Sequence, residues 1–345
     1  MKVAVIGGGL FGCTAAVYAA RAGHEVHLYE VKPKLMQGAT SCCYYRLHRG
    51  YHYPRSDETA LESLEAEHSF REEYGECVID GGQQFYAIPG IAQVTPDEFA
   101  EFMQRIGIPF ERHRDHLFRV EEPRLDAFML SVLVHRRVEA AGVHVHLNSD
   151  ITNSPPDFDC VVVATYAGLN RVMDAFGLPQ TKYKFQVVEK PIVRISKELE
   201  NTSIVVMDVC CIDPHQYTDC HALGHVSETI HAENVGYEPF IPDEIRPYIE
   251  LGVIRYWVGF EHSNVFDVLC SIAAYVPAVR NAEYIGSQYT VRAVLAHQEE
   301  TDARPTLVER YGNVIKVFSG KLGTAVVAAQ EVVGHLQQIR GLEAA

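Results

Sequence analysis

The chain contains 345 residues, enough for about two domains of ordinary size. Apolar residues make up 47% and charged residues 22%, so a large hydrophobic core can form and a globally disordered chain is excluded. The 45 acidic and 30 basic residues give a formal net charge of -15, which argues against nucleic acid or an anionic membrane surface as a partner.

Targeting signals and cysteine usage predict a cytoplasmic protein. No apolar run approaches the ~20 residues that cross a bilayer, so we expect no integral membrane segment. The short apolar start lacks a cleavage-site pattern and is not expected to be a signal peptide. The nine cysteines form no Cys-x-x-Cys pair and are expected to be mostly reduced thiols.

The first thirty residues predict a strand, a tight turn, a helix and a second strand. The apolar run 3–6 leads into the glycine-rich stretch 7–12, an alanine-rich helix follows, and the second strand ends at Glu30. This is the G-x-G-x-x-G pattern in the context that binds a dinucleotide.

Each residue type in this motif has a physical role. Gly7 allows the sharp turn, Gly9 lets a pyrophosphate approach the backbone, and Gly12 lets the helix pack closely on the strand. The helix N-terminus attracts phosphates, and Glu30 can accept hydrogen bonds from ribose hydroxyls. The cofactor-binding residues predicted from this unit are Gly7, Gly9, Leu10, Phe11, Gly12 and Glu30.

The motif alone fits NAD or FAD, and the rest of the chain favours FAD. After Glu30 the chain enters a long loop, 31–56, that contains no acidic residue, instead of further strand–helix units. The sheet is expected to resume with a helix over 125–141 and strands over 143–147 and 158–165. A last unit has a strand over 313–318, a turn over 319–324 and a helix from 325 to about 339.

The remaining residues form two blocks inserted into this pattern. Block 57–124 predicts two helices, one after Ser56 and one that begins with a capping box at Thr95. Block 181–290 predicts strands over 185–195, 203–209 and 253–259. We therefore expect an α/β fold: a Rossmann-like FAD-binding domain (parallel sheet with flanking helices) from 1–56, 125–180 and 291–345, and a second, α+β substrate or cap domain with a mixed or antiparallel sheet from 57–124 and 181–290.

Four segments spread over nearly the whole chain resemble the D-amino-acid oxidase superfamily of FAD enzymes, which has the glutathione-reductase-type FAD-binding fold. They are GGGLFG with Glu30, the GATS loop at 38–41, FDCVVVAT at 158–165, and RPTLVERYGNVIKVFSGKLGTAVVAA at 304–329. The resemblance implies that the GATS loop lines the pyrophosphate or flavin and that 320–324 caps the flavin ring. The further cofactor-binding residues expected are Ala39, Thr40, Ser41, Thr165, Gly320, Lys321, Leu322, Gly323 and Thr324.

One departure from the family pattern limits what the resemblance implies for catalysis. The loop after the GA(S/T) turn commonly carries an Asn, whereas this chain has Cys42-Cys43-Tyr44-Tyr45. Catalytic residues are therefore not carried over at that position.

The loop 46–55 is the best substrate-facing candidate, because it holds three arginines and two histidines in an acidic chain. Arginines there would attract a carboxylate or phosphate, and a neutral histidine would accept a proton. The alternative is that these residues pair with neighbouring acids or bind FAD phosphates. The catalytic candidates are Arg46, His48, His52, Tyr53 and, near the position where family members often place a substrate-binding arginine, Arg292.

The stretch 213–231 has the residue types of a metal site, including His221 and His225 four residues apart. Gly224 interrupts it and no second pair has ligand spacing, so no metal site is expected and polar pocket lining is favoured.

The sequence thus predicts an FAD-dependent oxidoreductase that removes hydride from a C–N or C–OH bond of a small, polar, anionic substrate. That substrate would be an amino acid, a hydroxy acid or a sugar derivative. A second partner, an electron acceptor such as oxygen, a quinone or another carrier, would reoxidise the flavin. The alternatives are a non-redox flavin-dependent sugar-nucleotide mutase or isomerase, and a protein that binds FAD structurally.

Overall fold

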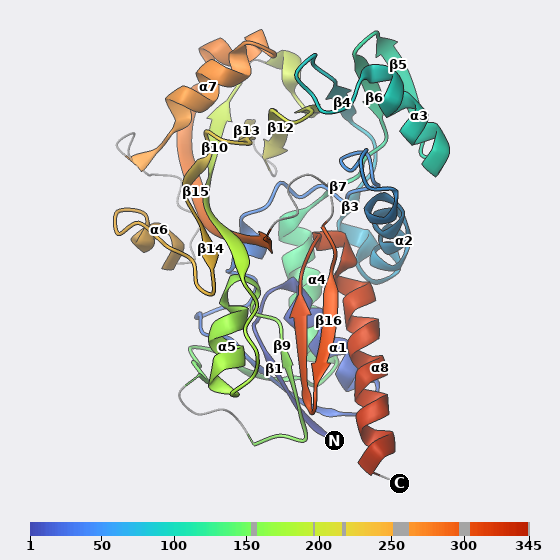
Figure 1. The fold of residues 1–345 in the computed structure, drawn as a ribbon, viewed down its shortest axis with the longest axis vertical. Helices are drawn as coiled ribbons and strands as arrows, with labels where there is room; N and C mark the ends of the chain where they lie inside the picture. The colour runs from blue at the N-terminus through green and yellow to red at the C-terminus, as the bar shows by residue number, and fades with distance from the viewer. Residues whose placement is uncertain (153–156, 196, 216–218, 251–261, 297–303, 344–345) are drawn as a thin grey trace.

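The computed structural model describes residues 1–152, 157–195, 197–215, 219–250, 262–296 and 304–343. Within them the chain forms two main sheets, one in the lower and one in the upper part of Figure 1, with both termini at the lower end. This is the α/β fold with a parallel and a mixed sheet that the sequence predicts. None of the described helices combines the length and the apolar character needed to cross a membrane.

The first sheet has the order β16-β17-β9-β1-β2-β8 and is parallel except for the β16–β17 pair. Its strands are β1 (Lys2–Ile6), β2 (Glu25–Tyr29), β8 (His144–His146), β9 (Cys160–Val163), β16 (Leu307–Tyr311) and β17 (Val314–Phe318). The predicted strands of the nucleotide-binding unit are therefore confirmed, and the order places β1 in the middle of the sheet.

Alternation along β1 sends successive side chains to opposite faces of this sheet. Val3 and Val5 pack in a core with α1 (Leu10–Arg21), α4 (Ala127–Ala140) and α8 (Ala325–Glu343). Ala4 and Ile6 pack in a second core with α5 (Leu169–Ala175). Both faces are covered at the centre of the sheet, which explains why β1 and β9 are continuous apolar runs.

The second sheet has the order β14-β10-β13-β12-β11-β4-β6-β5, and β15 also pairs with β10. It is antiparallel except for the parallel β4–β11 pair, so it is mixed as predicted. Its strands are β4 (Gln83–Ala87), β5 (Phe110–Arg114), β6 (Leu117–Val120), β10 (Tyr183–Arg194), β11 (Thr202–Val206), β12 (Cys210–His215), β13 (Cys220–His225), β14 (Ile230–Gly236) and β15 (Glu283–Leu295).

Among the described residues, the remaining elements are one short strand pair and four helices. A two-stranded pair joins β3 (Val78–Ile79) to β7 (Arg124–Leu125), and the other helices are α2 (Asp57–Tyr74), α3 (Pro96–Ile106), α6 (Arg246–Glu250) and α7 (Val265–Ala273). The capping box at Thr95 is present, with the Glu98 amide donating to the Thr95 hydroxyl over 3.2 Å. The strand expected over 253–259 lies outside the described residues.

Helix α2 lies beside α8 in Figure 1, at the first sheet. Its Phe70 and Tyr74 are buried in the same core as α1 and α8. The domain boundaries expected from the sequence, which assign this helix to the cap, stay a prediction.

Candidate active site

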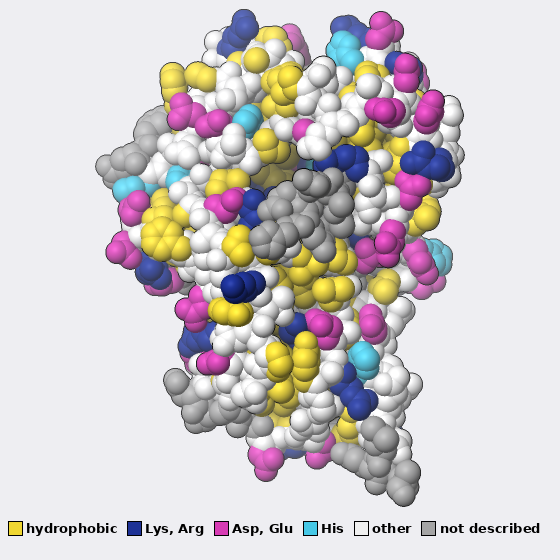
Figure 2. All heavy atoms as spheres, viewed as in Figure 1, with side chains coloured by type: hydrophobic (Ala, Val, Ile, Leu, Met, Phe, Trp, Pro, Cys, Tyr) yellow, Lys and Arg dark blue, Asp and Glu magenta, His cyan; other side chains and the backbone are white. Residues whose placement is uncertain are grey.

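A cavity of about 970 Å³ lies where the carboxyl ends of the first sheet meet the second sheet. This is at the upper end of the ~300–1,000 Å³ typical of ligand sites. Its lining begins at the glycine-rich turn, continues along the loop 38–53, and ends on β10, β12, β13 and β15. Figure 2 shows a shaded hollow in the upper half of this face of the molecule.

The three motif glycines are needed for different structural reasons. Gly7 has φ +108°, and a Cβ there would lie 2.5 Å from the Ala164 carbonyl oxygen. At Gly12 a Cβ would lie 1.8 Å from the Gly7 oxygen, so this glycine lets α1 approach the strand. At Gly9 the nearest atom would be the Thr40 hydroxyl at 3.4 Å. The protein itself leaves room at Gly9, which is where a pyrophosphate would approach the backbone.

The carboxylate of Glu30 lies at the end of β2 on the cavity wall. It accepts hydrogen bonds from the Gly8 amide (2.6 Å) and the Lys32 amide (2.9 Å), which fix its orientation. A carboxylate held in this way retains lone pairs for ribose hydroxyls. The Thr165 hydroxyl, also in the lining, is buried and has no hydrogen-bond partner among the described residues. The gap at Gly9, the N-terminus of α1, Glu30 and Thr165 together fit a dinucleotide.

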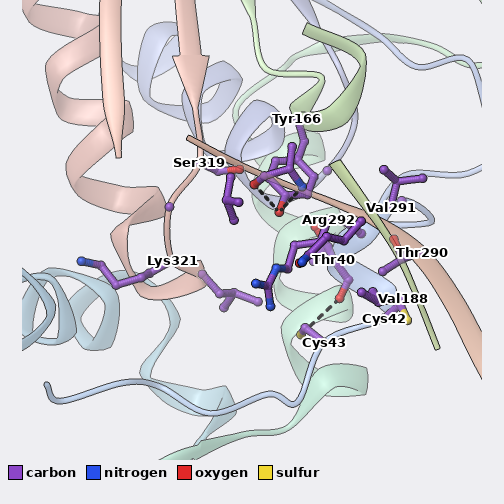
Figure 3. A pocket seen from close by; sticks show the side chains of 18 of the residues that line it. Thr40, Cys42, Cys43, Tyr166, Val188, Thr290, Val291, Arg292, Ser319 and Lys321 are labelled. Carbon is purple, nitrogen blue, oxygen red and sulfur yellow. Dashed lines mark hydrogen bonds between the residues drawn. The ribbon is translucent and has the colours of Figure 1, made fainter. Parts of the chain in front are cut away.

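The C-terminal unit contributes backbone to the cavity. A Cβ at Gly320 would lie 2.2 Å from the Arg304 carbonyl oxygen, so only glycine fits this close approach. Lys321 turns its side chain away from the cavity (Figure 3), and its Nζ lies 2.6 Å from a Glu62 carboxylate oxygen on α2. The Thr324 hydroxyl donates to the Lys321 carbonyl oxygen over 2.7 Å, at the start of α8.

Most of the predicted cofactor residues come together in the cavity lining. The members found there are Gly7, Gly9, Leu10, Phe11, Glu30, Ala39, Thr40, Thr165, Gly320, Lys321 and Leu322. The lining of this cavity does not include Gly12, Gly323 and Thr324. Ser41 lines a neighbouring cavity of about 460 Å³.

Arg46 is buried between two carboxylates. Its Nε lies 3.3 Å from an Asp213 oxygen and its Nη1 lies 3.7 Å from a Glu122 oxygen. Burial alone would lower the pKa of Arg46, but the negative charge of Asp213 and the other groups around it raise the pKa well above its usual value. Arg46 therefore remains charged, and its charge is balanced inside the protein.

Glu122 links Arg46 to the two histidines of the loop. It accepts from the Tyr86 hydroxyl (3.0 Å) and contacts His48 Nδ1 (2.9 Å). Burial would raise the pKa of Glu122, but His48 and Arg46 lower it to about 2. The rings of His48 and His52 stack at 5.6 Å, and both line the cavity with Tyr53.

Burial lowers the pKa of His52 to about 3, with the positive charges of His48 and Arg46 acting in the same direction. His52 is therefore neutral near pH 7 and can accept a hydrogen bond, while its low pKa makes it a weak base. The other arginines of the loop are bound elsewhere: Arg49 Nε lies 2.5 Å from Glu67, and Arg55 bonds to Gln93.

Arg292 reaches into the cavity from β15, where it stands opposite Gln186 of β10. Figure 3 shows its guanidinium between the segment that carries Lys321 and the loop that carries Thr40. Burial and the positive charge of Arg304 lower the pKa of Arg292. Among the described residues no carboxylate lies within ion-pair distance of it, so its charge faces the cavity.

Sequence reasoning missed the buried acids Glu122 and Asp213 and the amine of Lys190. Lys190 Nζ lies 3.9 Å from the centre of the Tyr44 ring, and its side chain is buried. The signal for it was the alternation along β10, which turns Lys184, Gln186 and Lys190 to the cavity. The nine cysteines are free thiols, and burial raises the pKa of Cys43 in the lining to about 11.

The stretch 213–231 does not gather into one cluster. Asp213 contacts Arg46, His221 Nε2 lies 2.9 Å from the Leu199 oxygen, and His231 Nε2 lies 2.8 Å from Glu189. His225 bonds to neighbouring residues of its own turn.

Comparisons with known proteins agree with this geometry. The family model for FAD-dependent oxidoreductases of the DAO type matches residues 2–201. The chain is 27% identical to the FAD-dependent monooxygenase kojA of Aspergillus flavus, over 98% of this chain and 86% of that protein. A shorter match, 34% identical over 26% of this chain and 24% of the relative, is the FAD-dependent monooxygenase FPY4 of Fusarium mangiferae.

Solved structures share the fold. Glycine oxidase from Geobacillus kaustophilus superposes with a TM-score of 0.70 at 16% identity, covering 98% of this chain and 95% of its own. L-amino acid deaminase from Proteus vulgaris gives 0.69 at 12% identity, covering 96% and 92%. The family match over more than half of the chain, on a site whose residues fit a dinucleotide, shows that this chain belongs to the DAO family of FAD-dependent oxidoreductases.

Proposed function

We propose that this FAD-dependent oxidoreductase removes hydride from a C–N or C–OH bond of a small, polar, anionic substrate. The observation that carries the proposal is Arg292, a cation that faces the cavity without a carboxylate partner among the described residues. An arginine fork binds a carboxylate through two parallel hydrogen bonds, which fixes the substrate's orientation as well as its charge.

The other cavity residues have matching roles in this proposal. When bound, FAD supplies the acceptor for the hydride, and an electron acceptor such as oxygen or a quinone completes the turnover. Neutral His52 accepts a hydrogen bond from the amine or hydroxyl group of the substrate and so orients it, because an imidazole with a pKa of about 3 is a weak base near pH 7. Glu122 holds His48 through its Nδ1 contact and thereby supports the stacked His52.

Anaerobic absorption spectroscopy tests the reaction type. The purified yellow protein is mixed with pools of amino acids, hydroxy acids and sugar derivatives, and the flavin band is followed. Bleaching by one pool is the expected result and names the substrate class. A flavin that stays oxidised with every pool contradicts the proposal, and turnover that needs a reductant but gives no net oxidation indicates a mutase.

Variants of Arg292 test the substrate's charge. Arg292→Met should raise KM for the bleaching substrate by about 10–100-fold, the loss expected for charge-assisted hydrogen bonds, and leave the flavin spectrum unchanged. Arg292→Lys should recover part of the loss, because the charge returns without the fork. Arg280→Met, an exposed arginine outside the cavity lining, is the matched control. Unchanged KM in Arg292→Met would remove the anion from the proposal.

A second candidate is oxygen insertion into the substrate, favoured by the relative kojA, which is named an FAD-dependent monooxygenase and matches 98% of this chain. A monooxygenase of this kind draws electrons from a separate reductant, whereas the proposed reaction draws them from the substrate. Oxygen from isotopically labelled O₂ would appear in the organic product in the first case and not in the second.

A further inference from the structure

A group of histidines lies on the first sheet, away from the cavity residues of the catalytic proposal. In the parallel pair β2–β8, His27 stands opposite His144 and Tyr29 stands opposite His146. Residues two apart on a strand share a face, so Glu25 joins His27 on the same side. The ring centroids of His27 and His144 are 4.7 Å apart, and His27 stacks on His146 at 5.2 Å.

We propose that Glu25, His27 and His144 form a binding site for a divalent transition-metal ion, with Zn²⁺ as the reference ligand. One ligand atom from each residue lies within 4.8 Å of the other two. Among the described residues this is the group that brings three such ligand atoms together. The sequence predicted no metal site, and it gave no sign of this group, because His144 is distant in sequence from Glu25 and His27 and becomes their neighbour only when β8 pairs with β2.

The ligand types select the ion class. Two imidazole nitrogens and a carboxylate oxygen suit Zn²⁺, Cu²⁺ or Ni²⁺, whereas Mg²⁺ and Ca²⁺ prefer oxygen ligands. In tetrahedral zinc sites the ligand atoms are about 3.3 Å apart, given bonds of about 2.0–2.1 Å. His27 Nε2 and the Glu25 oxygen are already 3.0 Å apart. The His144 side chain is exposed, so it is free to turn inward, and water would complete the coordination.

His146 orients His27 for this role. His27 Nδ1 lies 3.0 Å from His146 Nε2. When His27 Nδ1 carries the proton and donates it to His146, the lone pair of His27 Nε2 points at the Glu25 carboxylate. A cation between these two acceptors resolves their repulsion. Metal-binding histidines commonly have their other ring nitrogen held by a hydrogen bond in this way.

The expected consequence is that the ion joins the edge strand to the sheet. Strand β8 has three residues and pairs with β2 on one side, so few hydrogen bonds hold it. The Lys2 ammonium lies 4.0 Å from the Glu25 oxygen, and a bound ion would replace it as the partner of that carboxylate. An ion that binds the folded state and not the unfolded chain raises the unfolding temperature.

Calorimetric titration of the untagged, chelator-treated, FAD-loaded protein with ZnCl₂ tests the site. We expect one binding event that depends on His144, and a rise of about 3–6 °C in unfolding temperature at saturation. His144→Gln should abolish that event, and His146→Phe should weaken it about 10–100-fold. His68→Gln should change neither, because His68 and Glu72 form an exposed pair (3.3 Å) without a second histidine in the described structure.

Two results would overturn the proposal: no Zn²⁺ binding by the starting protein, or binding that His144→Gln leaves unchanged. The substituted side chain is exposed, and an unaltered flavin spectrum in each variant shows that the fold is intact. MgCl₂ in place of ZnCl₂ should give no comparable event, and equal binding of both ions would contradict the ligand assignment.

Discussion

Arg46, a substrate-binding candidate in the sequence, is engaged by two carboxylates of the protein itself. Its guanidinium lies between Asp213 and Glu122, and both acids are buried. Removing one member of a buried charge group leaves the others without compensation, which costs more than the pair itself contributes. The neutral replacement of all three members is therefore expected to cost less than the loss of one.

Arg46→Met is therefore expected to lower the free energy of unfolding by about 3–5 kcal/mol, measured by urea denaturation. The triple variant Arg46→Met, Glu122→Gln, Asp213→Asn should recover part of that loss. Arg105→Met, which removes an exposed ion pair with Asp57, should change stability little. A single variant as stable as the starting protein would show that the acids do not depend on Arg46.

His52 gives the protein a defined pH dependence. Its pKa is about 3 in the folded state and near 6.5 in the unfolded chain. Between these values the unfolded state binds the additional proton, so stability is full above about pH 6.5 and falls as the pH drops toward 3. At pH 5 the loss from this residue reaches about 2 kcal/mol. His52→Gln should flatten the stability curve between pH 7.5 and 5, and an unchanged slope would contradict the assignment.

At the residue scale, the sequence did not predict which way individual side chains point or which residues they contact. Lys321 belongs to the segment predicted to cap the flavin, and its backbone lines the cavity, but its ammonium pairs with Glu62 on α2. Arg46 finds Asp213 across 167 positions of the chain. Such partners depend on tertiary contacts, whereas the glycine pattern and the capping box are decided by neighbours within a few residues.

The glycine-rich turn and α1 form the element on which the cofactor prediction depends. Gly7 is required by the protein, because its φ is +108° and a Cβ would meet the Ala164 carbonyl at 2.5 Å. Gly9 has an ordinary φ of -76° and meets only Thr40. A methyl group at Gly9 would fill the space over the α1 N-terminus, where a pyrophosphate is expected.

Gly7→Ala and Gly9→Ala should consequently fail in different ways. Gly7→Ala should destabilise the chain by about 1–3 kcal/mol from backbone strain alone, with the steric contact added. Gly9→Ala should leave the unfolding of the FAD-free protein nearly unchanged but weaken FAD binding at least about 10-fold, followed by flavin fluorescence. Equal FAD affinity in Gly9→Ala would place the pyrophosphate elsewhere.

Helices and strands whose start and stop are marked by nearby residues were predictable from the sequence. The pairing of strands that are distant in sequence was less predictable. The strand–turn–helix–strand unit, the capped α3 and the final β17–α8 unit each carry their own start and stop signals. The second sheet was expected only as mixed, because the parallel pairing of β4 with β11 joins segments more than 100 residues apart. Its order depends on contacts that no short window contains.

At the scale of the molecule, the two sheets share one core. Strands β10 and β15 pair along twelve positions, and their lower ends pack against the first sheet. Phe185 and Val187 of β10 lie in the same apolar cluster as Ile6 and Val163. The Tyr183 and Phe318 rings stack at 4.7 Å between the two sheets. The cavity that holds Arg292 therefore depends on both sheets being in place.

This shared core predicts that the two parts unfold together. Far-ultraviolet circular dichroism and the release of flavin fluorescence should give the same midpoint during denaturation of the FAD-loaded protein. Phe185→Ala, which leaves a void between the sheets, should shift both midpoints equally, with a loss of about 3–5 kcal/mol. Phe266→Ala, an exposed side chain on α7, is the control and should shift neither. If flavin were released well before the secondary structure is lost, the cavity would open without unfolding of the shared core, and the two sheets would behave as separate units.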